Sequence, residues 1–133
     1  MKKLLLTSLL CFCVSAYAAN WKKIWENQNG DEMYIDLDNI ENVKNRSIIF
    51  NIKKLSDFLE ASGRGTLSMI SGYKINCRTK QYAHYGEEIA YDQQMGQGKI
   101  IDRHNSGVSS FQDSGREGDF HHTLVKYVCD RAK

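Results

Sequence analysis

The sequence contains no proline, and only four of its 133 residues are cysteines. With glycines dispersed as well, nothing in it indicates a linker, a repeat or a low-complexity segment, and the length is that of one domain. An excess of charge of one sign is also missing, because 18 basic residues stand against 16 acidic ones. This balance argues against a general nucleic-acid-binding protein.

The short motifs that carry catalysis or cofactor binding are absent too. There is no G-x-S-x-G, H-E-x-x-H, C-x-x-C or phosphate-binding glycine loop. His121 and His122 would point about 100° apart on a helix, which is a poor geometry for chelating a metal. Glu87 and Glu88 would alternate across a strand and so would not form a facing carboxylate pair. We therefore expect no enzyme activity, no cofactor and no metal site.

The longest apolar run lies at the N-terminus and is short for a membrane span, which needs about 20 residues. Lys2 and Lys3 precede an apolar stretch over residues 4–14, and Ala16-Tyr17-Ala18 has the small-x-small pattern that signal peptidase reads. The sequence predicts a cleaved signal peptide over residues 1–18 and a domain over residues 19–133 without a transmembrane segment. An uncleaved anchor is the alternative.

Lipid attachment is not expected, because neither leader cysteine directly follows a small residue: Cys11 follows Leu10, and Cys13 follows Phe12. The domain that remains after cleavage is expected to have a net charge near zero, because removing Lys2 and Lys3 from the 18 basic residues leaves 16, equal to the 16 acidic ones.

Short alternating segments separated by turn signals predict strands along most of the chain. Asn29-Gly30 is a hairpin signal, because both residues tolerate positive φ. One helical turn at 56–61 is expected between two strands, and a long polar loop at 103–118 is expected after the last strand. The predicted strands cover residues 21–26, 32–38, 47–55, 67–77 and 81–91, with a brief extension at 99–102.

The hydrophobic period changes near the C-terminus and predicts a helix near Asp119 to Ala132. Its apolar stripe falls at i, i+1, i+4 and i+5, on Leu124, Val125, Val128 and Cys129. Strands followed by one helix predict an α+β fold.

The stretch YKINCRTKQY, residues 73–82, places a cysteine among basic residues. Side chains alternate across a strand, so Cys77 belongs with Tyr73 and Ile75 on the apolar face. The basic residues point the other way and are poorly placed to activate the thiol: Lys74, Arg78 and Lys80.

Cys77 and Cys129 are the two cysteines outside the leader, and an oxidising compartment favours a disulfide between them. This disulfide would close a loop of about 50 residues. The loop-closure entropy that the unfolded chain loses would stabilise the fold by roughly 4 kcal/mol. The alternatives are a catalytic thiol, which would need a nearby base and exposure, and two buried free thiols.

Charges are grouped along the chain. Residues 24–43 hold six acids and no base, residues 44–54 hold four bases and no acid, and residues 61–86 hold four bases and no acid. Antiparallel strands could pair these blocks and neutralise them across the sheet. A basic face is the other interpretation.

Taken in order, several of these segments resemble the surface-adhesin protein E family of Gram-negative bacteria over nearly all of residues 19–133. The resemblance rests on Trp21, Tyr34-Ile35-Asp36, Tyr73-Lys74-Ile75-Asn76-Cys77, Met95-Gly96-Gln97-Gly98 and Tyr127-Val128-Cys129. It implies an antiparallel sheet of about six strands, with a C-terminal helix tethered to one face by the disulfide.

The resemblance also implies a function, which is adhesion to host laminin and vitronectin, with homodimer formation. The implicated segment surrounds the first cysteine, and its counterparts here are Tyr73, Lys74, Arg78 and Lys80. The best-studied member of the family is a lipoprotein, whereas no lipid attachment is expected here. That difference favours an alternative, a periplasmic envelope-accessory or inhibitor protein that binds another envelope protein.

Overall fold

The computed structural model describes residues 19–43 and 48–131. The predicted signal peptide, residues 1–18, and Ala132 lie outside the described residues. In chain order the elements are β1 (Trp21–Glu26), β2 (Glu32–Asp36), the 3-10 helix η1 (Leu37–Asn39), β3 (Glu41–Asn42), β4 (Ile49–Ser62), β5 (Thr66–Asn76), β6 (Gln81–Tyr91), the 3-10 helix η2 (Gln94–Gly96), β7 (Ile100–Val108), β8 (Gln112–Asp113) and α1 (Phe120–Arg131).

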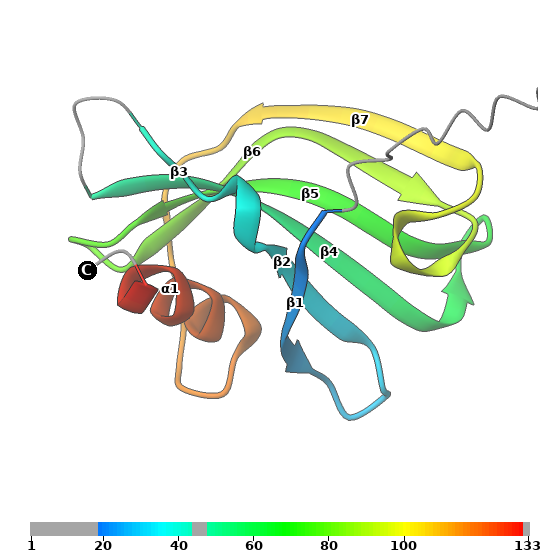
Figure 1. Ribbon diagram of the computed structural model, residues 1–133, viewed down its shortest axis with the longest axis horizontal. Helices are drawn as coiled ribbons and strands as arrows, with labels where there is room; N and C mark the ends of the chain where they lie inside the picture. Colours follow the sequence, from blue (N-terminus) through cyan, green and yellow to red (C-terminus); the bar gives the residue numbers. More distant parts are fainter. Residues whose placement is uncertain (1–18, 44–47, 132–133) are drawn as a thin grey trace, which may run out of the picture.

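The strands form one antiparallel sheet in the order β1-β2-β4-β5-β6-β7, and the two-residue strands β3 and β8 pair with β4 and β6. Helix α1 packs under one end of this sheet, while the strands extend well beyond it at the other end (Figure 1). The predicted α+β fold with about six main strands and a C-terminal helix is confirmed.

Three predicted boundaries were wrong. Strand β4 continues through residues 56–61, where a helical turn was expected, because these residues start a long hairpin in which Ser56 pairs with Met69. Strand β7 takes up residues 103–108 of the expected loop, since it pairs with β6. Strand β2 stops at Asp36, whose carboxylate accepts a hydrogen bond from the Asp38 backbone N–H and starts η1.

The main core lies between the sheet and α1. Buried side chains of β2, β4, β5 and β6 meet the predicted apolar stripe of the helix, whose members Leu124, Val125 and Val128 are all at most 2% exposed. The sheet contributes Ile35, Phe50, Ile52, Tyr73, Ile75 and Tyr82. The apolar side chains that recur with the 3.6-residue period of the helix therefore pack against those that recur with the two-residue period of the strands, in one interface.

Two contacts fix the ends of α1 on this core. The disulfide joins Cys77, directly after β5, to Cys129 in the last turn of the helix, with a Cα–Cα distance of 5.4 Å. At the other end, the Trp25 indole N–H donates to the Gly118 carbonyl at 3.0 Å, and its ring meets Phe120 edge-on at 5.8 Å. The predicted disulfide is confirmed, and the two free-thiol interpretations are wrong.

Within the described residues the opposite face of the sheet carries no α-helix, and only its far end is covered, by the segment around the 3-10 helix η2. The Asp57 carboxylate accepts from the Met95 N–H at 2.7 Å, and the Ser68 hydroxyl accepts from the Gly96 N–H at 2.9 Å. The middle of this face is left open. We call this whole face, opposite α1, the helix-free face.

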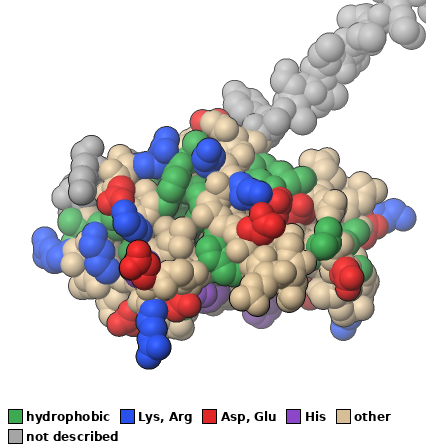
Figure 2. Space-filling view, turned by 90° about the horizontal axis from the view of Figure 1, so that it is seen from below, with side chains coloured by type: hydrophobic (Ala, Val, Ile, Leu, Met, Phe, Trp, Pro, Cys, Tyr) green, Lys and Arg blue, Asp and Glu red, His purple; other side chains and the backbone are tan. Residues whose placement is uncertain are grey.

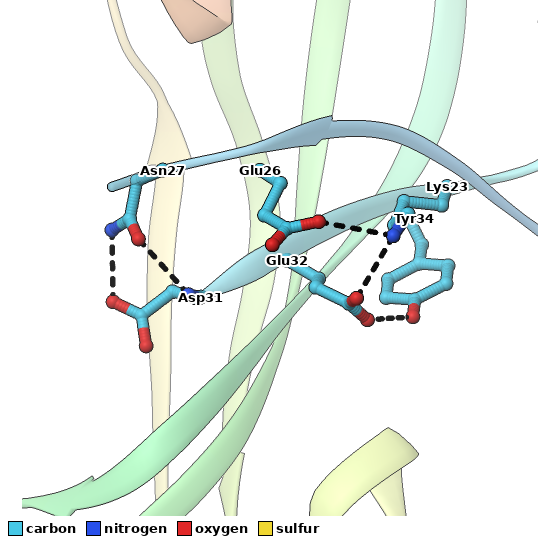
Figure 3. A network of polar contacts seen from close by, with 6 residues as sticks. All are labelled: Lys23, Glu26, Asn27, Asp31, Glu32 and Tyr34. Atoms are coloured by element: carbon cyan, nitrogen blue, oxygen red, sulfur yellow. Dashed lines mark hydrogen bonds and ion pairs between the residues drawn. The ribbon is translucent and has the colours of Figure 1, made fainter. Parts of the chain in front are cut away.

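Two acids of the acidic block are paired with a lysine of their own hairpin. Lys23 on β1 bridges Glu26 at 3.1 Å and Glu32 at 2.9 Å, and Tyr34 donates a hydrogen bond to Glu32 (Figure 3). These contacts raise the pKa of Lys23 and lower that of Glu32, while burial, together with the contact to Glu32, raises the pKa of Tyr34 to about 12. Among the described residues, no ion pair joins the acidic block 24–43 to either basic block.

Cys77→Ser with Cys129→Ser should lower the free energy of unfolding by roughly 4 kcal/mol, because the loop between positions 52 residues apart is no longer closed in the unfolded chain. Urea denaturation of the variant and of the wild type, each with and without reductant, measures the loss. Reductant should weaken only the wild type, and an unchanged midpoint in the double variant would contradict the prediction.

Candidate functional site

The helix-free face is the surface on which the predicted basic residues can meet a partner. Residues paired across antiparallel strands point to the same side of a sheet. Asn51 on β4 pairs with Lys74 on β5, and Lys53 pairs with Gly72. Lys53 and Lys74 therefore share the helix-free face, on neighbouring strands and two positions apart.

The Lys74 ammonium lies 4.4 Å from the centre of the Tyr85 ring, which β6 supplies from the next strand. A cation over an aromatic face is held by the ring quadrupole while it remains partly hydrated. Tyr85 itself is 39% exposed. This pair gives the helix-free face a fixed positive charge beside an accessible aromatic ring.

Arg78 and Lys80 reach the same end of the sheet from the turn between β5 and β6, not from the strand as predicted. Strand β5 ends at Asn76, whose side-chain oxygen accepts from the backbone N–H groups of Arg78 at 3.0 Å and Thr79 at 3.2 Å. Lys80 adopts a positive φ of 57°, which closes the turn. Both side chains are exposed.

Tyr73 lies on the other face, as its alternation with Lys74 predicts, and is only 2% exposed. Its ring packs 4.8 Å from His84 and 5.9 Å from Tyr82, beneath the start of α1. Burial raises the pKa of its phenol well above the usual range. The structure thus places Lys74 on the helix-free face and Arg78 and Lys80 in the turn that follows β5, and it separates Tyr73 from them in the core.

Sequence reasoning missed Lys53 as a site residue. It was counted in the basic block 44–54, but only the register between β4 and β5 places it next to Lys74. None of Lys53, Lys74, Arg78 and Lys80 forms an ion pair with another described residue. On the surface seen in Figure 2, Lys and Arg side chains are interspersed with Asp and Glu.

Two adjoining hollows mark the open part of the helix-free face, and we call them together the sheet-face groove. The first has a volume of about 260 Å³ and the second about 440 Å³. They share Asn39, Lys53, Ile70 and Ile89. The first extends to Glu41, Asn51 and Tyr85, and the second to Trp21 and Tyr91.

A bulge forms the floor of the first hollow. The register of β5 with β6 shifts between Ile70 and Tyr73, and that of β6 with β7 shifts at Gly86, which has a φ of 76°. The Tyr85 carbonyl oxygen then lies 2.1 Å from where a Cβ would stand on Gly72. Only glycine allows this close backbone approach, and it leaves the floor without a side chain.

One of the side chains that line this hollow holds a buried polar atom without a partner. The side-chain oxygen of Asn51, which lines the hollow, is buried and accepts no hydrogen bond within the described part of the chain. An unsatisfied buried acceptor costs roughly 1–3 kcal/mol, so it is rarely kept without a reason.

The helix-facing side holds a second polar cluster, centred on Lys54, which is 8% exposed. Its ammonium lies 5.3 Å from the Tyr73 ring centre and 5.2 Å from that of Phe120. Burial lowers the pKa of Lys54 to about 8, and Glu88 opposes the shift. Burial likewise lowers the pKa of His121, stacked 4.0 Å from Tyr82, to about 4. This cluster is part of the core.

Neither a metal centre nor a membrane helix is found in residues 19–43 and 48–131. No group of three or more His, Cys, Asp or Glu side chains there is arranged to hold a metal ion. No helix in that part is long and apolar enough to cross a membrane.

Comparison with known proteins places the fold. The profile of the surface-adhesin protein E family matches residues 21–130. Crystal form II of Haemophilus influenzae protein E has a TM-score of 0.60 at 15% identity, covering 84% of this chain and 88% of that one. Protein E from non-typeable Haemophilus influenzae gives 0.53 at 15% identity, covering 83% and 75%. No curated protein matches the chain by sequence.

Lys54→Met should raise the free energy of unfolding by roughly 1–3 kcal/mol at pH 7, because it removes a buried charge and keeps the volume. The folded pKa of Lys54, about 8, lies below the ordinary 10.5, so between these pH values the unfolded chain holds more protons. The stability of the wild type should therefore rise relative to the variant from pH 8 to 10.5. Urea unfolding across this range measures the difference.

Lys53→Met is the matched control for that experiment, because Lys53 is exposed on the other face. A stability difference between the wild type and Lys54→Met that stays constant with pH would contradict the prediction.

Proposed function

The chain belongs to the surface-adhesin protein E family, and from this premise we propose that it is an exported, non-enzymatic binding protein. Its partners are host extracellular-matrix proteins such as laminin and vitronectin. It contacts them through Lys74, Arg78 and Lys80, at and beside the β5–β6 turn, and through Lys53 on the neighbouring strand β4; we call these four residues the basic end.

The observation that carries the proposal is that these four cations are grouped and that none of them forms an ion pair with a described residue. Lysines that are already paired gain little from a new acidic partner, whereas unpaired ones add attraction and steer association. Lys23 and Lys126, by contrast, are each held by carboxylates of this chain. The total charge of the chain is only +2, so any preference for acidic partners has to come from such local grouping.

Tyr73 supports this surface from beneath. It is buried on the other side of β5, directly after Gly72 and before Lys74, and its ring packs against Tyr82 and His84. We assign it the role of fixing the strand that presents Lys74. A homodimer, which the family resemblance implies, would present two such basic ends and raise avidity.

Export is part of the proposal. Residues 1–18 act as a signal peptide and are removed before Ala19, and the domain acts in the periplasm or at the outer surface. A second candidate is favoured by the residues before Cys11 and Cys13, which do not suit lipid attachment. It is a periplasmic accessory or inhibitor protein that binds another envelope protein.

Lys74→Glu with Lys80→Glu should weaken binding to immobilised laminin and vitronectin by at least roughly ten-fold, because two attractive charges become repulsive. Binding of the oxidised protein is measured over a salt series, and the wild type should lose affinity as screening increases. Lys22→Glu with Lys99→Glu makes the same charge change at two exposed positions elsewhere. Equal binding by both double variants would exclude the basic end as the site.

The exported protein should begin at Ala19, as intact mass measurement of the purified product will reveal. Fractionation of the expressing cells then separates the two candidates, since an adhesin has to be accessible to protease on intact cells. Protection until the outer membrane is opened would favour the periplasmic partner. Recovery of a product that still carries residues 1–18 would contradict the signal peptide.

A further inference from the structure

The second hollow of the sheet-face groove is lined by the residue that the proposed cleavage would turn into the N-terminus. Ala19 lines it together with Asp36 and Asp38. We propose that the α-ammonium group of Ala19, which forms when residues 1–18 are removed, binds in this hollow to the carboxylates of Asp38 and Asp36. The inference rests on the part of the proposed function in which cleavage occurs before Ala19, and the identity of the matrix partner does not affect it.

The charges that line the second hollow are out of balance by one. Asp36 and Asp38 supply two carboxylates, and Lys53 supplies one ammonium group. None of these three residues forms an ion pair with a described residue. Asp36 is only 1% exposed, so water screens its charge poorly. A further cation is therefore attracted to the hollow.

The hydrogen bonds of the two carboxylates leave this charge in place. Asp36 accepts from the Asp38 backbone N–H at 3.1 Å and from the Asn39 side-chain amide at 2.6 Å. Asp38 is exposed, and its carboxylate accepts from the Asn20 side-chain amide at 3.3 Å. All these donors are neutral, so they orient the carboxylates without neutralising them.

The pairing of β1 with β2 carries the start of the domain to these carboxylates. The Leu37 N–H donates to the Asn20 carbonyl at 3.1 Å, one step beyond the last pair of the ladder. The next step of an antiparallel pairing sets Ala19 opposite Asp38. The bond from the Asn20 amide shows that the Asp38 carboxylate is turned toward the same segment. A terminal ammonium group at Ala19 therefore meets Asp38 first.

The protein's own terminus is favoured over a cation from solution. Ala19 is half-buried, and its carbonyl accepts from the Trp21 N–H at 3.0 Å, at the first residue of β1. A free cation loses translational freedom when it enters the hollow, whereas an ammonium group two residues from a fixed strand has already lost most of it. Tethering thus gives the Ala19 ammonium group a high effective concentration at the carboxylates.

One neighbouring charge opposes the binding. Lys53 lines the hollow, but it is exposed, and its flexible stem lets the ammonium group turn to solvent. The phenol of Tyr91 is the remaining titratable group among the described residues that line the hollow. With the Ala19 ammonium group in place, two cations would stand against two carboxylates.

Cleavage would thereby secure the edge strand that helps to hold α1. Before cleavage the Ala19 nitrogen belongs to a peptide bond and carries no charge, so the precursor lacks this interaction. Among the described strands β1 pairs with β2 alone, and it carries Trp25, whose indole donates to the Gly118 carbonyl just before α1. The mature chain should therefore hold β1 more firmly than the precursor does.

The test uses the exported, disulfide-bonded protein, labelled with ¹³C-alanine so that the Ala19 signals report the titration of its α-ammonium group. The pKa of this group should lie above the ordinary value for an α-amino group, about 7.7–8.0, because nearby carboxylates favour the charged form. Asp38→Asn should return the pKa toward that range, since it removes a charge and keeps the shape. Asp102→Asn, at an exposed aspartate of β7, is the matched control and should leave the pKa unchanged.

Stability against urea gives a second readout. A group whose pKa is higher in the folded chain stabilises the fold below its unfolded pKa, and this contribution is lost as the pH rises through the folded pKa. The difference in unfolding midpoint between the wild type and Asp38→Asn should be largest below about pH 7.7 and shrink above it. The difference between the wild type and Asp102→Asn should stay constant over this range.

Intact mass separates the failure of this inference from that of the proposed function. A product that keeps residues 1–18, or that begins at another residue, has no ammonium group at Ala19, which overturns both the proposed cleavage and this inference. A folded product that begins at Ala19 with an ordinary α-amino pKa overturns this inference alone. A raised pKa that Asp38→Asn leaves unchanged does the same.

Discussion

The contact between α1 and one end of one sheet face is the constraint on which the rest of the structure depends. A twelve-residue helix is marginal by itself in water, so its apolar stripe has to be buried against a partner. The disulfide from Cys77 to Cys129 holds one end of the helix there, and Trp25 holds the other. Because the only described α-helix is used in this way, the opposite face has no helical cover.

An uncovered sheet face has to avoid association through its apolar side chains, and the arrangement of this face suits that need. Lys53 and Lys74 place charges across it, and η2 covers its far end through Asp57 and Ser68. Charged side chains that interrupt an exposed apolar surface keep its apolar patches small and so limit association. The same features leave the cations and the groove available to a partner.

Much of this fold could be predicted because its signals are local. Strand β6 was predicted with its observed bounds, since residues 81–91 lie between clear turn signals, and the period change at Leu124 predicted the helix. Residues 103–108 of β7 and the end of β4 could not be predicted. Their side chains are largely exposed on both faces, so no hydrophobic alternation marks them, and only pairing with a neighbour makes them strands.

The residues of the candidate site likewise divide into those whose position the sequence predicts and those whose position only the fold decides. The sequence alone determined that Cys77 faces the core and that Lys74 faces away, because alternation along one strand is a local geometric rule. Only the tertiary structure decided that Lys53 joins Lys74, that Arg78 and Lys80 lie in a turn, and that Asn51 lines a hollow. These depend on strand register and on bulges. Both are set by contacts between residues far apart in the chain, on which a single strand carries no information.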